Sequence, residues 1–263
     1  MRRVPALDIA VLTSSAQGVE LAAALARMTE VRSVTVVTTG LLSQRLGPLD
    51  KARRLHRDDG LPGLVRAVVR RLFHPSRAGK REELASVVSR ACPGVTHIHC
   101  DDLHAPSSIA RLRELAPDLG VVFATYPLRA EVFTIPRLGC LNLHLGRAPE
   151  FRGSSPGFYE LLEGVPEVGV TIHRVIAGLD AGPILLQEVF PLDLAPSEDP
   201  ISYLRNYQAE ILMPNGIRMM ARAVERMALG TVEEHSQPPG RRPRRRASHR
   251  LKQELRRRVA GRR

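Results

Sequence analysis

The chain is organised around the stretch GCLNLHLGRAPEFRG, from Gly139 to Gly153. It begins as an apolar run in which two polar residues, Asn142 and His144, occupy alternate positions. Alternate residues of a β-strand point to the same face of a sheet, so this spacing places an amide and an imidazole side by side. The loop that follows contains glycine and proline, which is typical of a loop at the mouth of a cleft. The stretch therefore predicts a rigid strand that presents two polar side chains to a ligand.

Apolar strand patterns and helical patterns alternate on both sides of this stretch. The chain begins with a strand pattern at 7–13, a helix pattern at 19–28 and a β-branched strand pattern at 34–38. A strand–helix–strand order predicts a parallel sheet with helices on its faces. The later segments are helices at 82–90 and 107–115, strands at 95–99, 119–124, 168–175 and 184–190, and a long helical pattern at 201–229 that breaks near Pro214. The predicted class is therefore α/β with a mostly parallel sheet.

The composition is typical of a folded globular protein. The 263 residues are 43% hydrophobic and 25% charged, which is enough apolar material for a full core. No apolar run approaches the ~20 residues that span a bilayer, and the amino-terminal apolar patch is too short for a signal sequence. The chain has only three cysteines, without paired spacing, so we expect no disulfide framework and a cytoplasmic protein.

The formal net charge of +12 comes mainly from two basic segments, at 51–81 and 241–263. The first contains an amphipathic helical pattern at 64–73, which we interpret as a surface helix with solvated arginines. The second we interpret as a solvated, partly disordered basic end with helical character at 248–259. The alternative is a salt-dependent interaction of the tail with nucleic acid or an anionic membrane.

Two cofactor classes are disfavoured by the residues that would bind them. The segment from His97 to His104 is rich in His, Cys and Asp, but the neighbouring cysteines, Cys92 and Cys100, lack the short spacing of a metal site. The first turn, TSSAQG at 13–18, has a single glycine, whereas dinucleotide-binding turns are rich in glycine. We therefore expect neither a metal nor a nicotinamide cofactor.

Asp180 is a third polar residue that stands out against the apolar patterns. It lies between Gly178 and Gly182, where the backbone can approach a ligand closely. An aspartate between glycines is more often a turn former, and a single histidine at a strand end is more often structural. From residue types alone, a catalytic role for Asn142, His144 and Asp180 competes with two structural interpretations, a turn-forming aspartate and a structural histidine.

The residues from Leu119 to Leu192 resemble the catalytic domain of the folate-dependent formyltransferase family. The matching features, in chain order, are Asn142-Leu143-His144, Pro149, Arg152-Gly153, Gly169 to His173, and Leu179 to Pro183. Members of this family include glycinamide ribonucleotide, methionyl-tRNA and amino-sugar N-formyltransferases. The resemblance implies a Rossmann-like formyltransferase fold with a helical C-terminal extension.

The resemblance also implies a domain organisation. The catalytic domain is expected at 1–195, with the basic insert at about 41–81 inside it. A helical segment is expected at 196–230, followed by the basic, partly disordered tail at 231–263.

In the family, the corresponding asparagine, histidine and aspartate form the catalytic set, which implies this role for Asn142, His144 and Asp180. The implied co-substrate is 10-formyltetrahydrofolate, whose formyl carbon is attacked by a neutral amine. Asn142 and a protonated His144 are expected to donate hydrogen bonds to the formyl oxygen as its negative charge develops. Asp180 is expected to hold the imidazole, raise its pKa and relay the proton that the amine loses.

The resemblance further implies where the two substrates bind. The folate pterin is expected against an apolar wall with nearby backbone hydrogen-bonding groups. The residues expected to form it are Tyr126, Pro127, Leu128, Ile176, Ala177, Gly178 and Leu179. The residues expected near the amine are Arg147, Arg152, Gly153 and His173.

We expect an N-formyltransferase that acts on a primary amine of a small substrate, such as an amino sugar or a natural-product intermediate. The alternatives are formylation of methionyl-tRNA or glycinamide ribonucleotide, and hydrolysis of formyl-folate. The glycine-poor first turn disfavours glycinamide ribonucleotide, and the lack of a string of strands after Leu192 disfavours methionyl-tRNA. A non-catalytic protein that binds through its basic tail is a further alternative, against which the joint presence of Asn142, His144 and Asp180 argues. The sequence predicts no oligomeric state.

Overall fold

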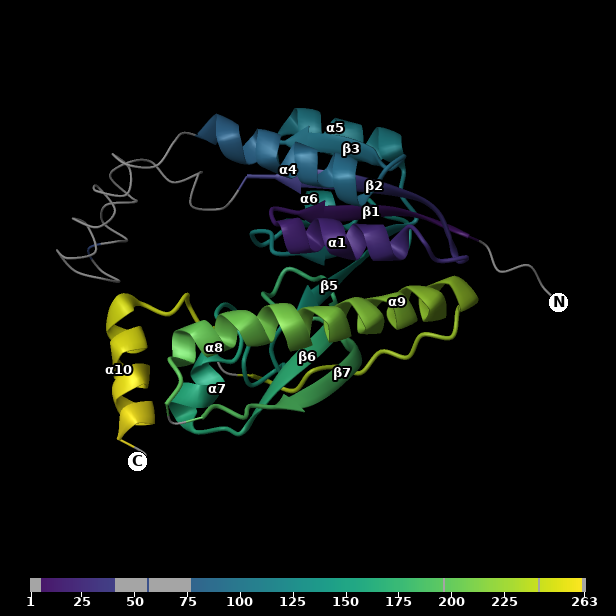
Figure 1. Cartoon of the computed structure of the whole chain (residues 1–263). Helices are drawn as coiled ribbons and strands as arrows, with labels where there is room; N and C mark the ends of the chain where they lie inside the picture. The colour runs from purple at the N-terminus through teal and green to yellow at the C-terminus, as the bar shows by residue number, and fades with distance from the viewer. Residues whose placement is uncertain (1–5, 41–55, 57–76, 196, 241, 262–263) are drawn as a thin grey trace.

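The computed structural model describes residues 6–40, 56, 77–195, 197–240 and 242–261. A seven-stranded sheet in the order β3-β2-β1-β4-β5-β6-β7 runs through the molecule, with helices on both faces (Figure 1). The predicted α/β architecture is confirmed. The predicted basic helix at 64–73 lies outside the described residues.

The helices and strands follow the predicted order. The first half contains β1 (Leu7–Thr13), α1 (Ala16–Leu25), β2 (Val31–Thr39), α4 (Arg77–Ala91), β3 (Thr96–Cys100), α5 (Pro106–Leu115), β4 (Leu119–Phe123) and α6 (Ala130–Phe133). The second half contains β5 (Cys140–His144), α7 (Phe158–Glu163), β6 (Glu167–Arg174), β7 (Ile184–Pro191), α8 (Pro200–Tyr207), η1 (Gln208–Leu212), α9 (Met213–Leu229) and α10 (His249–Ala260).

The sheet is mostly parallel, as predicted. The strands β3, β2, β1, β4 and β5 pair in parallel, whereas β6 runs antiparallel to both β5 and β7. All five residues of β4 are buried, because a strand inside a parallel sheet is covered on both faces. Strand β7 lies at the edge and alternates between more buried and more exposed residues.

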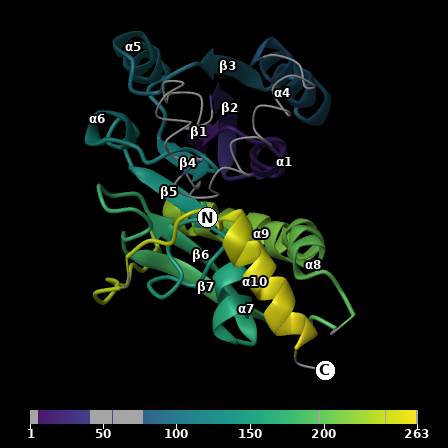
Figure 2. The same cartoon turned by 90° about the vertical axis from the view of Figure 1, so that its left-hand side faces the viewer.

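Two apolar cores lie on opposite faces of the sheet. The larger core includes Leu21 of α1, Val88 of α4 and Met219 of α9. The smaller core includes Leu112 of α5 and Val132 of α6. Figure 2 shows α1, α4 and α9 on one side of the sheet and α5 and α6 on the other. The sheet is therefore the middle of three layers, and its strand ends are held rigidly.

The long helical pattern after the sheet is interrupted where the sequence predicts. Helices α8 and α9 are joined by η1, a π-helical turn that ends immediately before Met213 and Pro214. Proline has no N–H and its ring collides with the carbonyl four residues earlier, so a wider turn accommodates it. No helix in the described part of the chain is long and apolar enough to cross a membrane.

The described part of the basic tail contains helix α10, which agrees with the helical character expected at 248–259, but the helix is packed on the body instead of being solvated. Ser248 is the N-cap of helix α10, and its side chain accepts a hydrogen bond from the Leu251 N–H over 3.2 Å. The helix packs on α7 and α8, and Leu255 and Val259 are buried. Leu251, Leu255 and Val259 recur every four residues and form an apolar stripe, which the many arginines mask in the composition.

The histidines of β3 form hydrogen bonds with β2. The hydroxyl of Thr38 lies 2.8 Å from Nε2 of His97 and 2.9 Å from Nδ1 of His99. His99 also pairs with Asp101 over 3.1 Å. Among the described residues, no group of three or more His, Cys, Asp or Glu side chains could hold a metal ion.

Candidate active site

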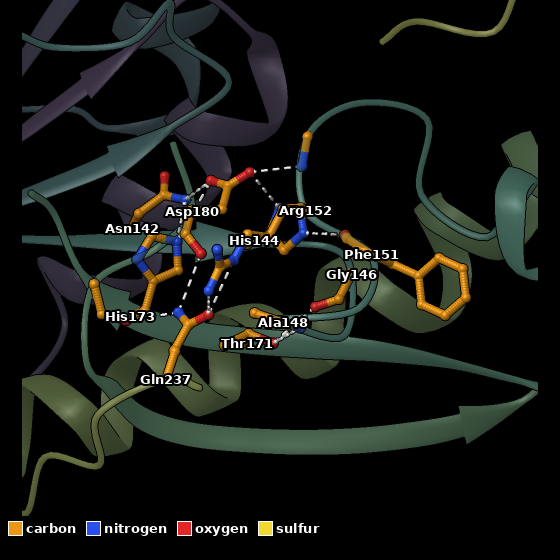
Figure 3. Close-up of polar contacts among 12 residues, drawn as sticks. Asn142, His144, Gly146, Ala148, Phe151, Arg152, Thr171, His173, Asp180 and Gln237 are labelled. Atoms are coloured by element: carbon orange, nitrogen blue, oxygen red, sulfur yellow. Dashed lines mark hydrogen bonds and ion pairs between the residues drawn. The ribbon is translucent and has the colours of Figure 1, made fainter. Parts of the chain in front are cut away.

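The pairing of β5 with β6 brings two polar side chains together at the end of β5. In the antiparallel register, Asn142 lies opposite His173, and His144 lies opposite Thr171. Asn142 Nδ2 is 3.0 Å from His173 Nε2 (Figure 3). His173 Nδ1 lies 2.9 Å from the carbonyl oxygen of Arg174, so Nδ1 carries a hydrogen. In the neutral ring, Nε2 of His173 therefore accepts the hydrogen bond of the Asn142 amide.

Asp180 reaches this pair from the loop between β6 and β7. Its backbone has a φ of 48°, in the left-handed region, which turns the side chain back towards the strands. Its Oδ1 lies 3.4 Å from Asn142 Nδ2 and 3.5 Å from His173 Nε2, and its Oδ2 lies 3.6 Å from His144 Nδ1. The structure therefore brings together the three residues expected to be catalytic, with His173 as a fourth member.

The imidazole of His144 is buried between two oxygen atoms. Its Nε2 lies 2.8 Å from the carbonyl oxygen of Phe151, which can only accept, so Nε2 carries a hydrogen. Burial lowers the pKa of His144 below its ordinary value, and this outweighs the opposing effects of Asp180 and of the hydrogen bond to Phe151. The expected raised pKa of His144 is wrong, because the ring loses more hydration than its neighbouring carboxylate replaces.

Asp180 is held as a carboxylate. Burial tends to raise its pKa, but the neighbouring His173 and His144 side chains and the N–H of Gly153 together lower the pKa below its ordinary value. The Gly153 N–H donates to Oδ2 over 2.8 Å. The cluster thus combines an ionised, buried carboxylate with a neutral imidazole and an amide.

Asn142 is the least enclosed of the three residues, since His144 and Asp180 are buried whereas Asn142 is only partly covered. Its amide donates a good hydrogen bond to His173 and a long one, 3.4 Å, to Asp180. A ligand oxygen could take the place of the longer bond at little cost. The arrangement can therefore stabilise a developing oxyanion beside a buried base.

Thr171 and Gln187 fix the loop that follows β5. The Thr171 hydroxyl donates to the carbonyl of Gly146 over 2.7 Å and accepts from Gln187 Nε2 over 3.0 Å. Gln187 also donates to the carbonyl of Ala148 over 2.8 Å. Thr171 lies within the motif from Gly169 to His173, but the sequence pattern assigns it no role of its own. Local patterns do not indicate Gln187, because its role depends on the pairing of β6 with β7.

Gln237 clamps the Asp180 loop from the C-terminal segment. Its Nε2 donates to the carbonyls of Asp180 and Gly182 over 3.1 and 2.6 Å. Its Oε1 accepts from Nε and Nη2 of Arg152 over 3.1 and 2.6 Å (Figure 3). Gln237 therefore joins the loop of Asp180 to the loop that contains Gly153. Sequence reasoning missed it, because the polar stretch around it carries no distinguishing pattern.

The residues expected to contact the folate fall into two groups. Ile176, Ala177, Gly178 and Leu179 form an exposed segment directly before Asp180, and the exposed fractions of Ile176 and Leu179 are 40% and 41%. Exposed apolar side chains beside the buried polar cluster fit a flat heteroaromatic ring.

The other segment is more enclosed. Pro127 is exposed, but Tyr126 and Leu128 belong to the smaller core. The Tyr126 hydroxyl accepts from the Leu103 N–H over 2.6 Å and lies 3.3 Å from Thr39 Oγ1. The side chains of Tyr126 and Leu128 are therefore part of the packing, and the contact of this segment with the folate stays a prediction.

The residues expected near the amine are also divided. Arg152, Gly153 and His173 belong to the cluster. Arg147 instead forms ion pairs with Glu150 and Glu167, at 3.7 and 3.6 Å. The structure does not bring Arg147 into contact with the cluster.

The chain matches the family model described as formyl transferase over residues 12–214. It is 35% identical over 175 residues to a methionyl-tRNA formyltransferase of Roseiflexus castenholzii, covering 66% of this chain and 54% of that protein. The chain spans about half the length of the curated relatives that it matches.

Solved structures show the same fold. Glycinamide ribonucleotide transformylase 1 from Symbiobacterium toebii superposes with a TM-score of 0.57 at 22% identity, covering 88% of this chain and 95% of that one. An N-formyltransferase from Helicobacter canadensis, in complex with folinic acid and dTDP-3-aminofucose, superposes with a TM-score of 0.50 at 14% identity, covering 88% and 67%.

Proposed function

The chain belongs to the formyl transferase family, and from this premise we propose that it is an N-formyltransferase that moves the formyl group of 10-formyltetrahydrofolate to a primary amine. The observation that carries the proposal is the convergence of Asn142, His144 and Asp180 on one buried cluster. A folate donor is further supported by the folinic acid named with the Helicobacter canadensis protein.

The proposed chemistry uses the contacts of the cluster. A neutral amine attacks the formyl carbon, and negative charge develops on the formyl oxygen. The Asn142 amide donates to this oxygen in place of its 3.4 Å bond to Asp180. The bound geometry supplies further rate, because amine and formyl carbon are held in contact.

Proton balance assigns a role to Asp180. The amine nitrogen loses one proton, and the departing nitrogen of tetrahydrofolate gains one. The ionised carboxylate of Asp180 accepts the first proton. The neutral His144 presents its unprotonated Nδ1 to this carboxyl group over 3.6 Å, so the pair shares the proton until the departing nitrogen takes it. Gly153 keeps the carboxylate oriented through its N–H.

A small amine, such as an amino sugar, is our first proposal for the acceptor of the formyl group. The amino-sugar ligand named with the Helicobacter canadensis protein supports this class. Methionyl-tRNA is the second candidate, because the Roseiflexus castenholzii relative carries that activity in its name.

The test is formyl transfer by the purified full chain. Tetrahydrofolate release from 10-formyltetrahydrofolate is followed with a panel of amino sugars, sugar-nucleotide amines and methionyl-tRNA. We expect release that depends on one class of amine. Equal release without any amine identifies a hydrolase instead, and no release with any member of the panel refutes the proposal.

A further inference from the structure

A small cavity next to His144 contains polar groups to which the proposed function assigns no role. It is lined by His144 and by polar side chains of the following loop and helix, together with one residue of the C-terminal segment. The residues that matter here are Ser154, Tyr159, Glu160 and Arg244. Because His144 lines it too, the cavity adjoins the cluster described above.

Glu160 places a carboxylate in this cavity. Only 2% of the residue is exposed, and burial raises the pKa of Glu160 to about 7. The carboxylate accepts hydrogen bonds from the backbone N–H groups of Gly157 and Glu160 at the start of α7. These bonds fix the side chain, but Oε1 has no hydrogen-bond partner among the described residues.

Arg244 enters the cavity from the C-terminal segment. Its backbone pairs with Gly153, since its N–H donates to the Arg152 carbonyl over 2.7 Å and its carbonyl accepts from the Ser154 N–H over 2.9 Å. Its guanidinium pairs with Glu163 and lies 5.1 Å from the centre of the Tyr159 ring. Its buried Nε has no hydrogen-bond partner in the described parts of the chain.

The cavity therefore offers one unsatisfied acceptor, Glu160 Oε1, and one unsatisfied donor, Arg244 Nε. Leaving such buried polar groups unpaired destabilises the folded protein, so an occupant that pairs with them is favoured. Since both residues line the same small cavity, a small group that both donates and accepts is complementary to them. An anion is repelled by the carboxylate and a cation by the guanidinium, so the complementary group is an uncharged hydroxyl, and water has the same hydrogen-bonding capacity.

We propose that this cavity is a subsite for a hydroxyl group of the amine substrate, which makes the substrate an amino alcohol such as an amino sugar. The proposal rests on the proposed formyl transfer, because the amine is taken to react beside His144. It adds Glu160 and Arg244 as the residues that select the substrate. The C-terminal segment thereby contributes directly to substrate recognition.

The experiment compares amines that differ by one hydroxyl, such as D-glucosamine with its 3-deoxy and 4-deoxy analogues, and trans-2-aminocyclohexanol with cyclohexylamine. Formyl transfer gives kcat/KM for each, and calorimetry in the presence of 5-formyltetrahydrofolate gives Kd without turnover. In the wild type, we expect at least one hydroxylated amine to exceed its deoxy partner by about 10-fold or more, since a site built around a hydroxyl rejects the analogue that lacks it.

Two variants test the assignment from opposite sides of the cavity. In Glu160→Gln, the amide oxygen can still accept from the backbone at the start of α7, while the other position becomes a donor. In Arg244→Lys, the charge opposite Glu163 remains but the Nε donor is lost. The hydroxyl preference is the ratio of kcat/KM for the hydroxylated amine to kcat/KM for its deoxy partner. We expect this ratio to fall towards 1 in both variants. Glu225→Gln, the same chemical change on the exposed face of α9, should retain the wild-type preference.

The outcomes separate the subsite from the enzymatic activity. If no pair differs in kcat/KM or Kd in the wild type, or if both cavity variants keep the preference, the subsite is refuted. If the hydroxyl preference appears in Kd and depends on Glu160 and Arg244 while no amine is formylated, the subsite stands and formyl transfer fails.

Discussion

The backbone N–H of Gly153 donates a hydrogen bond to Oδ2 of Asp180 and so ties the loop after β5 to the carboxylate at the centre of the cluster. Gly153 has a φ of 102°, a conformation that favours glycine. A Cβ at this position would also collide with the backbone of Arg244. The C-terminal segment can therefore lie against the loop only because residue 153 has no side chain.

Gly153→Ala is expected to disturb both contacts. The strained backbone and the collision should together lower the free energy of unfolding by about 2–4 kcal/mol, and kcat/KM should fall at least about tenfold because Asp180 loses a fixed donor. Urea unfolding and formyl transfer measure the two effects. The control is Gly94→Ala, because Gly94 has a φ of 84° with nothing within 4 Å of a Cβ. Equal losses of stability and activity in the two variants would contradict this account.

Asn142→Ala is expected to reduce kcat by about 10²–10³-fold, the typical loss for one oxyanion donor. The affinity for 5-formyltetrahydrofolate should change little, because the expected folate segment before Asp180 is separate from this side chain. Single-turnover kinetics and equilibrium binding give the two quantities. Asn215→Ala removes an amide whose hydrogen bonds are to the Ile211 carbonyl and the Arg218 guanidinium, both in the C-terminal helices, and should behave as wild type. Unchanged turnover in Asn142→Ala would remove Asn142 from the mechanism.

Gln237→Ala should weaken folate binding more than it slows chemistry. Gln237 holds the carbonyls of Asp180 and Gly182, so its loss frees the loop whose exposed part is expected to contact the pterin. We expect KM for the folate to rise about tenfold, as for the loss of two hydrogen bonds, with a smaller change in kcat. Gln237→Glu still accepts from Arg152 and should be intermediate. The control is Gln253→Ala in α10, and a pure kcat effect in Gln237→Ala would argue against a role in loop positioning.

Glu160→Gln should change how stability depends on pH. The folded-state pKa of Glu160 is about 7, against an ordinary value of 4.5, so the folded protein binds the proton more tightly than the unfolded chain between these values. The contribution of Glu160 to stability is therefore fully present below pH 4.5 and is lost as the pH rises to 7, by up to about 3 kcal/mol.

Urea unfolding at pH 4.5 and pH 8 measures this effect. We expect Glu160→Gln to gain stability relative to the wild type as the pH rises, whereas Glu225→Gln should show no such gain. If the free energies of unfolding of Glu160→Gln and the wild type differ by the same amount at both pH values, the carboxylate of Glu160 is not destabilised by burial.

Leu255→Ala tests the packing of the C-terminal helix. The side chain is fully buried against the body, so its truncation should lower the free energy of unfolding by about 2–4 kcal/mol. Leu251→Ala, at a partly buried position of the same helix, should cost less. A loss below about 0.5 kcal/mol for Leu255→Ala would indicate a solvated tail, as surface positions show.

Local patterns were enough to predict the strands and the cluster of Asn142 and His144. Strand β1 has the predicted bounds, and β5 carries the alternating pair at its end. The position of His173 opposite Asn142 was not available from local patterns, because it depends on the register of an antiparallel pair.

The features that sequence reasoning did not give depend on contacts between distant segments. The lowered pKa of His144 results from burial by packed loops, which no local pattern reports. Gln237 and Arg244 belong to a stretch whose composition resembles a solvated linker, so nothing local distinguishes them from their neighbours. The arginines of α10 likewise hid the apolar stripe that folds the tail.

The position of Gln237 and Arg244 after the last strand of the sheet sets the order in which the sheet and the site are completed during synthesis. A chain emerges from the ribosome with its amino-terminal part first. Every strand of the sheet is translated before either residue, so a nascent chain can assemble the sheet and the Asp180 loop while the two contacts are still missing. The site is therefore completed only after the whole sheet has been synthesised, when Gln237 and Arg244 reach the Asp180 and Gly153 loops.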